Sequence, residues 1–205
     1  MSDASPSRSR ENTRARLLTA ASEVFAESGF DGASVEAICE RAGFTRGAFY
    51  SNFGSKDELF FGLMQQVSEA KLERVSTRVR ELEGEGLPAM TPAELVLRVL
   101  DIEHEERLGV VLMSEIRTNA MRDRRLARAF LDWEDAMIER VAQIIADLAA
   151  AYTLRLRMPA QDAARFVLQN WDATCVHAVI AGLTPAETLR LITERTVALA
   201  SAIAD

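Results

Sequence analysis

The sequence has few residues of the types that cross-link, break or anchor a chain. It contains two cysteines in 205 residues, Cys39 and Cys175, which is too few for the disulfide framework of a small secreted protein. Both fall on or near apolar faces of predicted helices, so we expect buried free thiols, as in a reducing cytoplasm. Five prolines and ten glycines leave room for long helices.

Long apolar runs are also absent. No stretch approaches the roughly 20 apolar residues that a membrane-spanning helix needs. The first ten residues, MSDASPSRSR, lack the apolar core of a secretory signal, and their Ser, Pro and Arg content predicts disorder over residues 1–9. The sequence therefore predicts a cytoplasmic protein without membrane contact.

Side-chain clusters that carry out catalysis or bind metals are missing as well. We find no nucleophile beside a base, no glycine-rich phosphate loop and no cysteine cluster. The acidic run at 101–106 includes a single histidine, His104, and this pattern is more typical of a solvated helix face than of a metal site. His177 lies on an otherwise apolar helix and fits a core or interface position better than a ligand. The sequence predicts no enzyme, no metal and no cofactor.

The charge is negative overall and uneven along the chain. A formal net charge of −7 argues against a protein that coats nucleic acid. The first sixteen residues nevertheless carry four arginines against two acidic residues. A basic end on an acidic chain suits a protein that reads DNA at selected sites, although the same pattern also describes a solvated tail.

Residues 34–53, SVEAICERAGFTRGAFYSNF, carry the most informative pattern. Ser34 can cap a helix, because its hydroxyl accepts a hydrogen bond from a free first-turn N–H. Val35, Ile38 and Ala42 follow at helical spacing and form one apolar stripe. Gly43 then ends the helix, since glycine adopts the left-handed conformation freely.

A second short helix follows directly. Thr45 can cap it, and Phe49 and Phe53, four residues apart, form its buried face, which leaves Arg46 and Tyr50 outside. Two short helices joined by a tight turn form a helix-turn-helix, and the second helix has the size that fits the major groove of DNA. Two such helices also build domains with no DNA role, so the flanking sequence decides between these interpretations.

The flanking sequence favours DNA binding. The run from Arg16 to Phe60 resembles the DNA-binding head of the tetracycline-repressor (TetR) family. The shared features are Phe25-Ala26, Gly29-Phe30, Ala37-Ile38, Ala42-Gly43, Gly47, Phe49-Tyr50, Asn52-Phe53, Lys56 and Glu58-Leu59. The resemblance implies a homodimer and a small-molecule pocket in the rest of the chain. It also implies DNA contacts by the residues that match the family's contact positions, which are Thr45, Arg46, Gly47, Tyr50, Asn52 and Lys56.

The chemistry of these residues agrees with the implied contacts. Small side chains at Gly47 and Ala48 allow the backbone to come close to the bases, and the helix starts at Ser34 and Thr45 can hold phosphate oxygens. Arginine, at position 46, pairs well with guanine. The full predicted DNA-binding set is Ser34, Thr45, Arg46, Gly47, Ala48, Tyr50, Asn52 and Lys56.

The whole chain is predicted to be all-α, with about nine helices, because it has no alternating β-branched run bounded by turns. We expect an N-terminal three-helix DNA-binding domain over 10–55, followed by a larger helical domain for effector binding and dimerisation over 56–205. Gly29 should end the first helix, 84–88 should form a linker, and Gly109 should break a later helix.

The second domain carries large apolar side chains that fit either an ordinary core or a pocket for a small apolar ligand. The predicted pocket residues are Leu63, Met64, Val67, Ile102, Met113, Ile116, Phe130, Trp133, Met137 and Trp171. Candidate polar anchors for the ligand are His104, Glu115, Asn119, Asn170 and His177. The last two helices carry more apolar surface than one thin domain hides, which predicts a two-fold four-helix dimer interface.

These features predict a DNA-binding transcriptional regulator, acting as a repressor that a small apolar effector releases from its operator. Two alternatives stay open. One is a helix-turn-helix regulator controlled by a protein partner, which a body without a cavity would favour. The other is an enzyme or carrier on the same fold, which would need catalytic groups and would fail to bind DNA.

Overall fold

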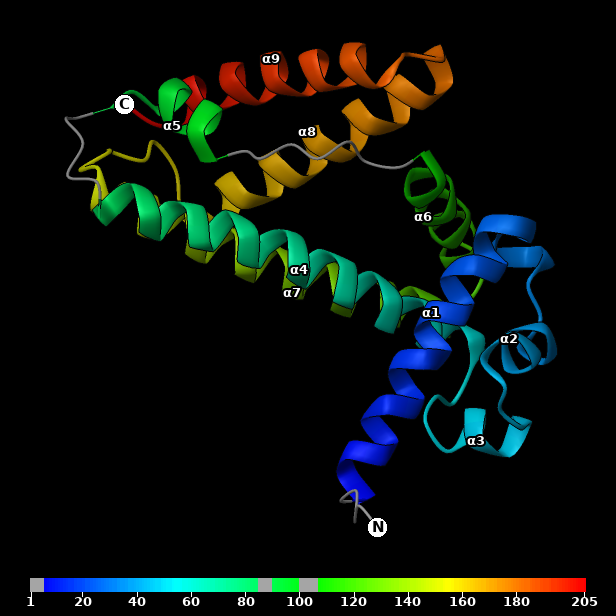
Figure 1. The fold of residues 1–205 in the computed structure, drawn as a ribbon. Coiled ribbons are helices and arrows are strands. Elements are labelled where there is room, and N and C mark those ends of the chain that lie inside the picture. Colours follow the sequence, from blue (N-terminus) through cyan, green and yellow to red (C-terminus); the bar gives the residue numbers. More distant parts are fainter. Residues whose placement is uncertain (1–5, 85–89, 100–106) are drawn as a thin grey trace. The chain divides into compact units, whose positions relative to one another are not determined.

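The computed structural model describes residues 6–84, 90–99 and 107–205, and these form nine helices and no strand (Figure 1). The all-α prediction is therefore confirmed. The helices are α1 (Pro6–Gly32), α2 (Val35–Ala42), α3 (Arg46–Tyr50), α4 (Lys56–Gly84), α5 (Pro92–Val99), α6 (Arg107–Ala120), α7 (Arg124–Ala151), α8 (Ala160–Ala181) and α9 (Pro185–Ile203).

Two helix boundaries differ from the sequence prediction. α1 begins at Pro6, inside the segment predicted to be disordered. Gly109 lies in the first turn of α6 and does not break a helix, which the modest cost of one glycine permits. The predicted break at Gly29 is confirmed, because its φ of 71° interrupts the helical backbone of α1.

The chain forms two compact units, which we call the head unit and the body unit. The head unit comprises Met1–Ser68 and Leu112–Trp133, and the body unit comprises Glu69–Val111 and Glu134–Asp205. Three helices, α4, α6 and α7, pass from one unit into the other. The predicted domains, 10–55 and 56–205, remain a prediction about where the chain divides in function.

An aromatic core fixes α1 and α4 in the head unit. The rings of Phe25, Phe30 and Phe60 lie 5.3–5.8 Å apart in pairs, two of them edge to face, an arrangement that aromatic rings favour. Phe49 and Phe53 are fully buried, as their four-residue spacing predicts. These contacts hold the helix-turn-helix by its apolar side and leave its polar side in solvent.

The body unit is built from two kinds of helix pairing. Val79 and Leu82 of α4 are buried against Ile144 and Leu148 of α7. α8 and α9 form a hairpin that turns at Gly182, whose φ is 66° (Figure 1). Among the described residues, no helix is both long and apolar enough to span a bilayer.

Candidate nucleic-acid interface

Side-chain caps begin both helices of the helix-turn-helix. The Ala37 N–H donates to Ser34 Oγ over 3.1 Å, and the Ala48 N–H donates to Thr45 Oγ1 over 3.2 Å. Gly43 joins the two helices with a φ of 70°. The local signals in the sequence therefore place α2 and α3 correctly, because each one acts within four residues.

The outer side of α3 presents an aromatic ring next to a bare stretch of backbone. Tyr50 is 51% exposed, and its ring lies edge-on to the buried Phe49 ring with centroids 5.2 Å apart. A Cβ added at Gly47 would meet nothing nearer than Thr45 Oγ1, at an ordinary contact distance of 3.7 Å. Packing within the chain therefore does not require glycine at position 47.

Arg46 is the one cation on α3, and it is paired. Its Nη1 lies 2.9 Å from Oε1 of Glu36, in the first turn of α2. The guanidinium carbon lies 5.9 Å from the centroid of the Tyr50 ring. A hydrogen bond with Tyr50 and the charge of Glu36 raise the pKa of Arg46, so the guanidinium stays charged.

Asn52 and Lys56 are more occupied than the sequence suggests. The Asn52 amide donates to the Ala48 carbonyl over 2.8 Å, and its Oδ1 is buried without a partner among the described residues. Lys56 Nζ donates to the carbonyls of Phe30, at 2.7 Å, and Ala33, at 2.9 Å. Burial lowers the pKa of Lys56. The ammonium has three N–H groups, so one remains for a phosphate.

The arginines of α1 hold the helix-turn-helix in place, a role that the sequence analysis missed. Their guanidinium groups donate to carbonyls that follow or end α2 and α3, where a cation also complements the helix dipole. The bonds run from Arg10 to Ser51, from Arg14 to Asn52 and from Arg16 to Ala42, over 3.1, 3.0 and 2.8 Å. Two of these guanidinium groups also stack, Arg14 on Phe53 at 4.1 Å and Arg16 on Phe44 at 4.6 Å. The four-residue spacing of Arg10 and Arg14 was the available signal, because it places both side chains on one side of a helix.

The corner between α1 and α2 is bound from two directions inside the head unit. Glu115 Oε2, on α6, accepts from the Phe30 N–H over 2.7 Å, while Lys56, on α4, binds the Phe30 carbonyl. Asn119 Nδ2, also on α6, donates to Asp31 Oδ1 over 3.0 Å. Glu115 and Asn119, predicted as ligand anchors, therefore contact this corner.

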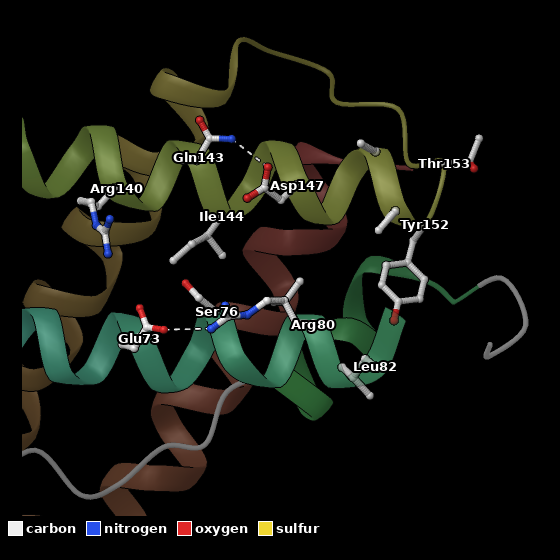
Figure 2. A pocket seen from close by; sticks show the side chains of 13 residues that line it. Glu73, Ser76, Arg80, Leu82, Arg140, Gln143, Ile144, Asp147, Tyr152 and Thr153 are labelled. Carbon is white, nitrogen blue, oxygen red and sulfur yellow. Dashed lines mark hydrogen bonds and ion pairs between the residues drawn. The ribbon is translucent and has the colours of Figure 1, made fainter. Parts of the chain in front are cut away.

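A groove of about 1150 Å³ lies between α4 and α7 in the body unit (Figure 2). Its apolar lining residues include Val79, Leu82 and Ile144. Its polar lining residues carry both charges: Arg80 pairs with Glu73 over 2.8 Å, and Gln143 donates to Asp147 over 2.7 Å. The other lining residues are Ser76, Arg140, Ala150, Ala151, Tyr152 and Thr153.

One end of the groove shows two unusual features. The Tyr152 hydroxyl is buried and has no hydrogen-bond partner among the described residues. Thr153, next to it, has a φ of 55°, a left-handed conformation that a β-branched residue rarely adopts. A buried unpartnered hydroxyl beside a strained residue marks this end as a place where a ligand could supply the missing partner.

The residues predicted for an apolar pocket do not line this groove. They are divided between the two units, and Ile102 lies outside the described residues. Phe130 and Trp133 lie together in the head unit, with ring centroids 6.0 Å apart, whereas Ile116 is fully buried and Val67 is 42% exposed. His104 and the acidic run at 101–106 also lie outside the described residues, among which no three metal-binding side chains cluster.

Comparison with known proteins gives the same fold and head. The family profile described as "Bacterial regulatory proteins, tetR family" matches residues 17–63. The chain is 31% identical to the HTH-type transcriptional regulator UidR of Escherichia coli K12 over 135 residues, which are 66% of this chain and 65% of UidR. It is 38% identical to the HTH-type transcriptional repressor AcnR of Corynebacterium efficiens over 65 residues, which are 32% of this chain and 35% of AcnR.

A solved structure extends the likeness to the whole fold. A putative TetR-family transcriptional regulator from Mesorhizobium loti superposes with a TM-score of 0.68, at 19% identity, over 94% of this chain and 97% of that one. Fold and site together define an all-helical protein with an N-terminal helix-turn-helix. The chain belongs to the TetR family of bacterial regulatory proteins. These relatives are named regulators, in agreement with the prediction that the chain is not an enzyme.

Proposed function

We propose that this protein is a transcriptional regulator that binds a partly palindromic DNA operator as a homodimer in the cytoplasm. The observation that carries the proposal is the outer side of α3. There an exposed Tyr50 and a paired Arg46 flank Gly47, a position that internal packing leaves open. Backbone close to the bases, a hydroxyl for phosphate and a guanidinium for guanine are the parts that a recognition helix needs.

Operator binding should depend on the Tyr50 hydroxyl. Tyr50→Phe keeps the ring that lies against Phe49 and removes only the hydroxyl. Because a hydrogen bond to a charged group contributes about 1.5–3 kcal/mol, we expect affinity for the operator to fall about tenfold or more. The operator is first selected from random duplexes with the wild-type chain, and affinities are then compared by gel shift. Equal affinities would exclude a DNA contact by the Tyr50 hydroxyl, and failure of the wild type to select any sequence would reject the function.

We also propose that a ligand bound in the body unit controls the head. Glu115 of α6 accepts from the Phe30 N–H and Lys56 of α4 donates to the Phe30 carbonyl, and both helices extend into the body unit. A ligand that displaces either helix would shift this corner and with it α3, and DNA would be released by population shift. Repression with release by the ligand is the simplest mode of control. Control by a protein partner is the alternative, and a body that binds no small molecule would favour it.

The groove between α4 and α7 supports a ligand with both apolar and polar parts. The apolar pocket predicted from sequence is a second location for the same role. Tyr152→Phe tests the groove, because it removes the buried hydroxyl that has no partner in the described part of the chain. We expect this variant to melt at a higher temperature than wild type in the absence of ligand, since an unpaired buried polar group costs roughly 1–3 kcal/mol.

The same variant should bind ligand more weakly. Compounds are screened by thermal shift against the wild-type chain, and each hit is then titrated against both chains and against the operator complex. A compound that binds in the groove should bind Tyr152→Phe more weakly than wild type. It should also lower the affinity of the protein for the operator, and the operator should lower the affinity for the compound by the same factor. Hits that bind both chains equally would place the ligand elsewhere.

A further inference from the structure

An ion pair joins the first turn of α2 to the recognition helix. Glu36 and Arg46 are both well exposed, with side-chain exposures of 58% and 62%, and their charged atoms lie 2.9 Å apart. Tyr50 adjoins the same guanidinium. The pair therefore belongs to the surface that the proposed function assigns to DNA, and it brings a carboxylate to that surface.

Stability accounts for this carboxylate only in part. An exposed ion pair contributes little, and the position of Glu36 in the first turn of α2 adds a modest favourable interaction with the helix dipole. The phosphates of DNA repel a carboxylate, however. The Glu36 carboxylate also occupies the Arg46 guanidinium, which would otherwise bind a phosphate. A carboxylate at position 36 therefore lowers the sequence-independent affinity of the protein for DNA.

The major groove offers a carboxylate only a few partners. A carboxylate is an acceptor, and the amino groups that donate there belong to cytosine and adenine, with glutamate typically accepting from cytosine N4. An arginine released from its pair can bond guanine through O6 and N7. Where a guanine and a cytosine amino group both lie within reach, Arg46 and Glu36 can therefore give up their ion pair, and each can bond a base instead.

We propose that the Glu36–Arg46 pair determines operator specificity, by weakening attachment to the DNA backbone and by reading guanine with Arg46 and a cytosine amino group with Glu36. The proposal rests on the proposed DNA-binding function. It differs from simple phosphate contact by Arg46 in one respect: the carboxylate reduces affinity for most DNA and contributes to affinity for the operator.

The test is Glu36→Gln, which keeps the shape and removes the charge. Glu27→Gln is the matched control, because Glu27 is similarly exposed, at 61%, pairs with Arg41 over 2.7 Å in the same head unit, and changes the net charge by the same amount. The full-length chains are compared on the selected operator and on a random duplex of equal length, over a range of salt concentrations.

We expect Glu36→Gln to bind the random duplex about fivefold more tightly and to steepen its salt dependence by about 0.9 per protomer, the contribution of one freed phosphate contact. The ratio of operator to random affinity should fall at least about tenfold, since the loss of one base contact weakens operator binding while random binding becomes tighter. Reselection from random DNA should lose a cytosine at one position of each half-site. Glu27→Gln should change none of these by more than twofold.

An unchanged ratio in Glu36→Gln, or an equal change in Glu27→Gln, overturns the proposal. Glu36→Asp is the second variant, because it keeps the charge and shortens the reach. It should retain the weak random binding and lose the cytosine preference. A wild-type chain that selects no operator rejects the proposed function and leaves this inference without a basis, so the two failures are distinguishable.

Discussion

Gly47→Ala is expected to weaken operator binding at least about 30-fold without destabilising the protein. The added Cβ has space inside the chain, since its nearest neighbour is Thr45 Oγ1 at 3.7 Å. A recognition helix whose backbone lies close to the bases has no such space on its outer side. Overpacking a tight contact costs about 1–3 kcal/mol, and a dimer carries two copies of the change, so the loss amounts to roughly 30-fold or more.

The stability readout separates a DNA clash from damage to the fold. Alanine is a better helix former than glycine by roughly 0.5–1 kcal/mol, so the melting temperature of Gly47→Ala should stay the same or rise. Gly109→Ala is the matched control, because an added Cβ there meets no described residue within 4 Å and Gly109 also lies in a first helical turn. If both variants bind the operator as wild type does, the α3 backbone does not lie against DNA.

Ile180→Glu should separate the dimer and reduce operator affinity at least about 100-fold. The solvent-facing side of α8 carries exposed residues at a three-and-four spacing, the pattern that packs helices nearly parallel in four-helix bundles. These residues are Phe166, Gln169, Ala173, His177 and Ile180. Ile180 is 80% exposed in the single chain, which is a large apolar exposure without a partner. A glutamate buried there costs several kcal/mol, and a monomer holds only one half-site.

Sedimentation at micromolar concentration measures the separation, and a gel shift on the operator measures its consequence. Met121→Glu serves as the control, because Met121 is 76% exposed on the head unit and lies outside the proposed interface. Phe166→Glu tests the other end of the same face of α8. If the Ile180 and Phe166 variants both sediment as dimers, the interface lies on a different surface.

The apolar spacing of the last two helices, which predicted a dimer interface, illustrates a limit of sequence patterns. Ala163, Ala178, Ile192 and Ile203 belong to this spacing in α8 and α9, yet each is at most 6% exposed within the single chain. Their spacing correctly indicates burial, but the pattern is the same whether the covering surface belongs to the chain itself or to a partner. Only the packed α8–α9 hairpin assigns these side chains to the interior.

The sequence by itself determined the helices, the helix-turn-helix and the family. Ser34, Gly43, Thr45 and Gly182 act through bonds or backbone angles within four residues of themselves, so their effect is independent of the rest of the fold. The burial of Phe49 also followed from local spacing alone.

Only the tertiary structure decided what the polar side chains of the head contact. Lys56, predicted from sequence as a DNA contact, donates to carbonyls 23 and 26 residues away, and Glu115 accepts from a backbone N–H 85 residues away. The pairing of Glu36 with Arg46 likewise depends on the angle between two helices. A long side chain can reach several partners, and the partner it meets is set by how distant segments pack, which no local spacing in the sequence records.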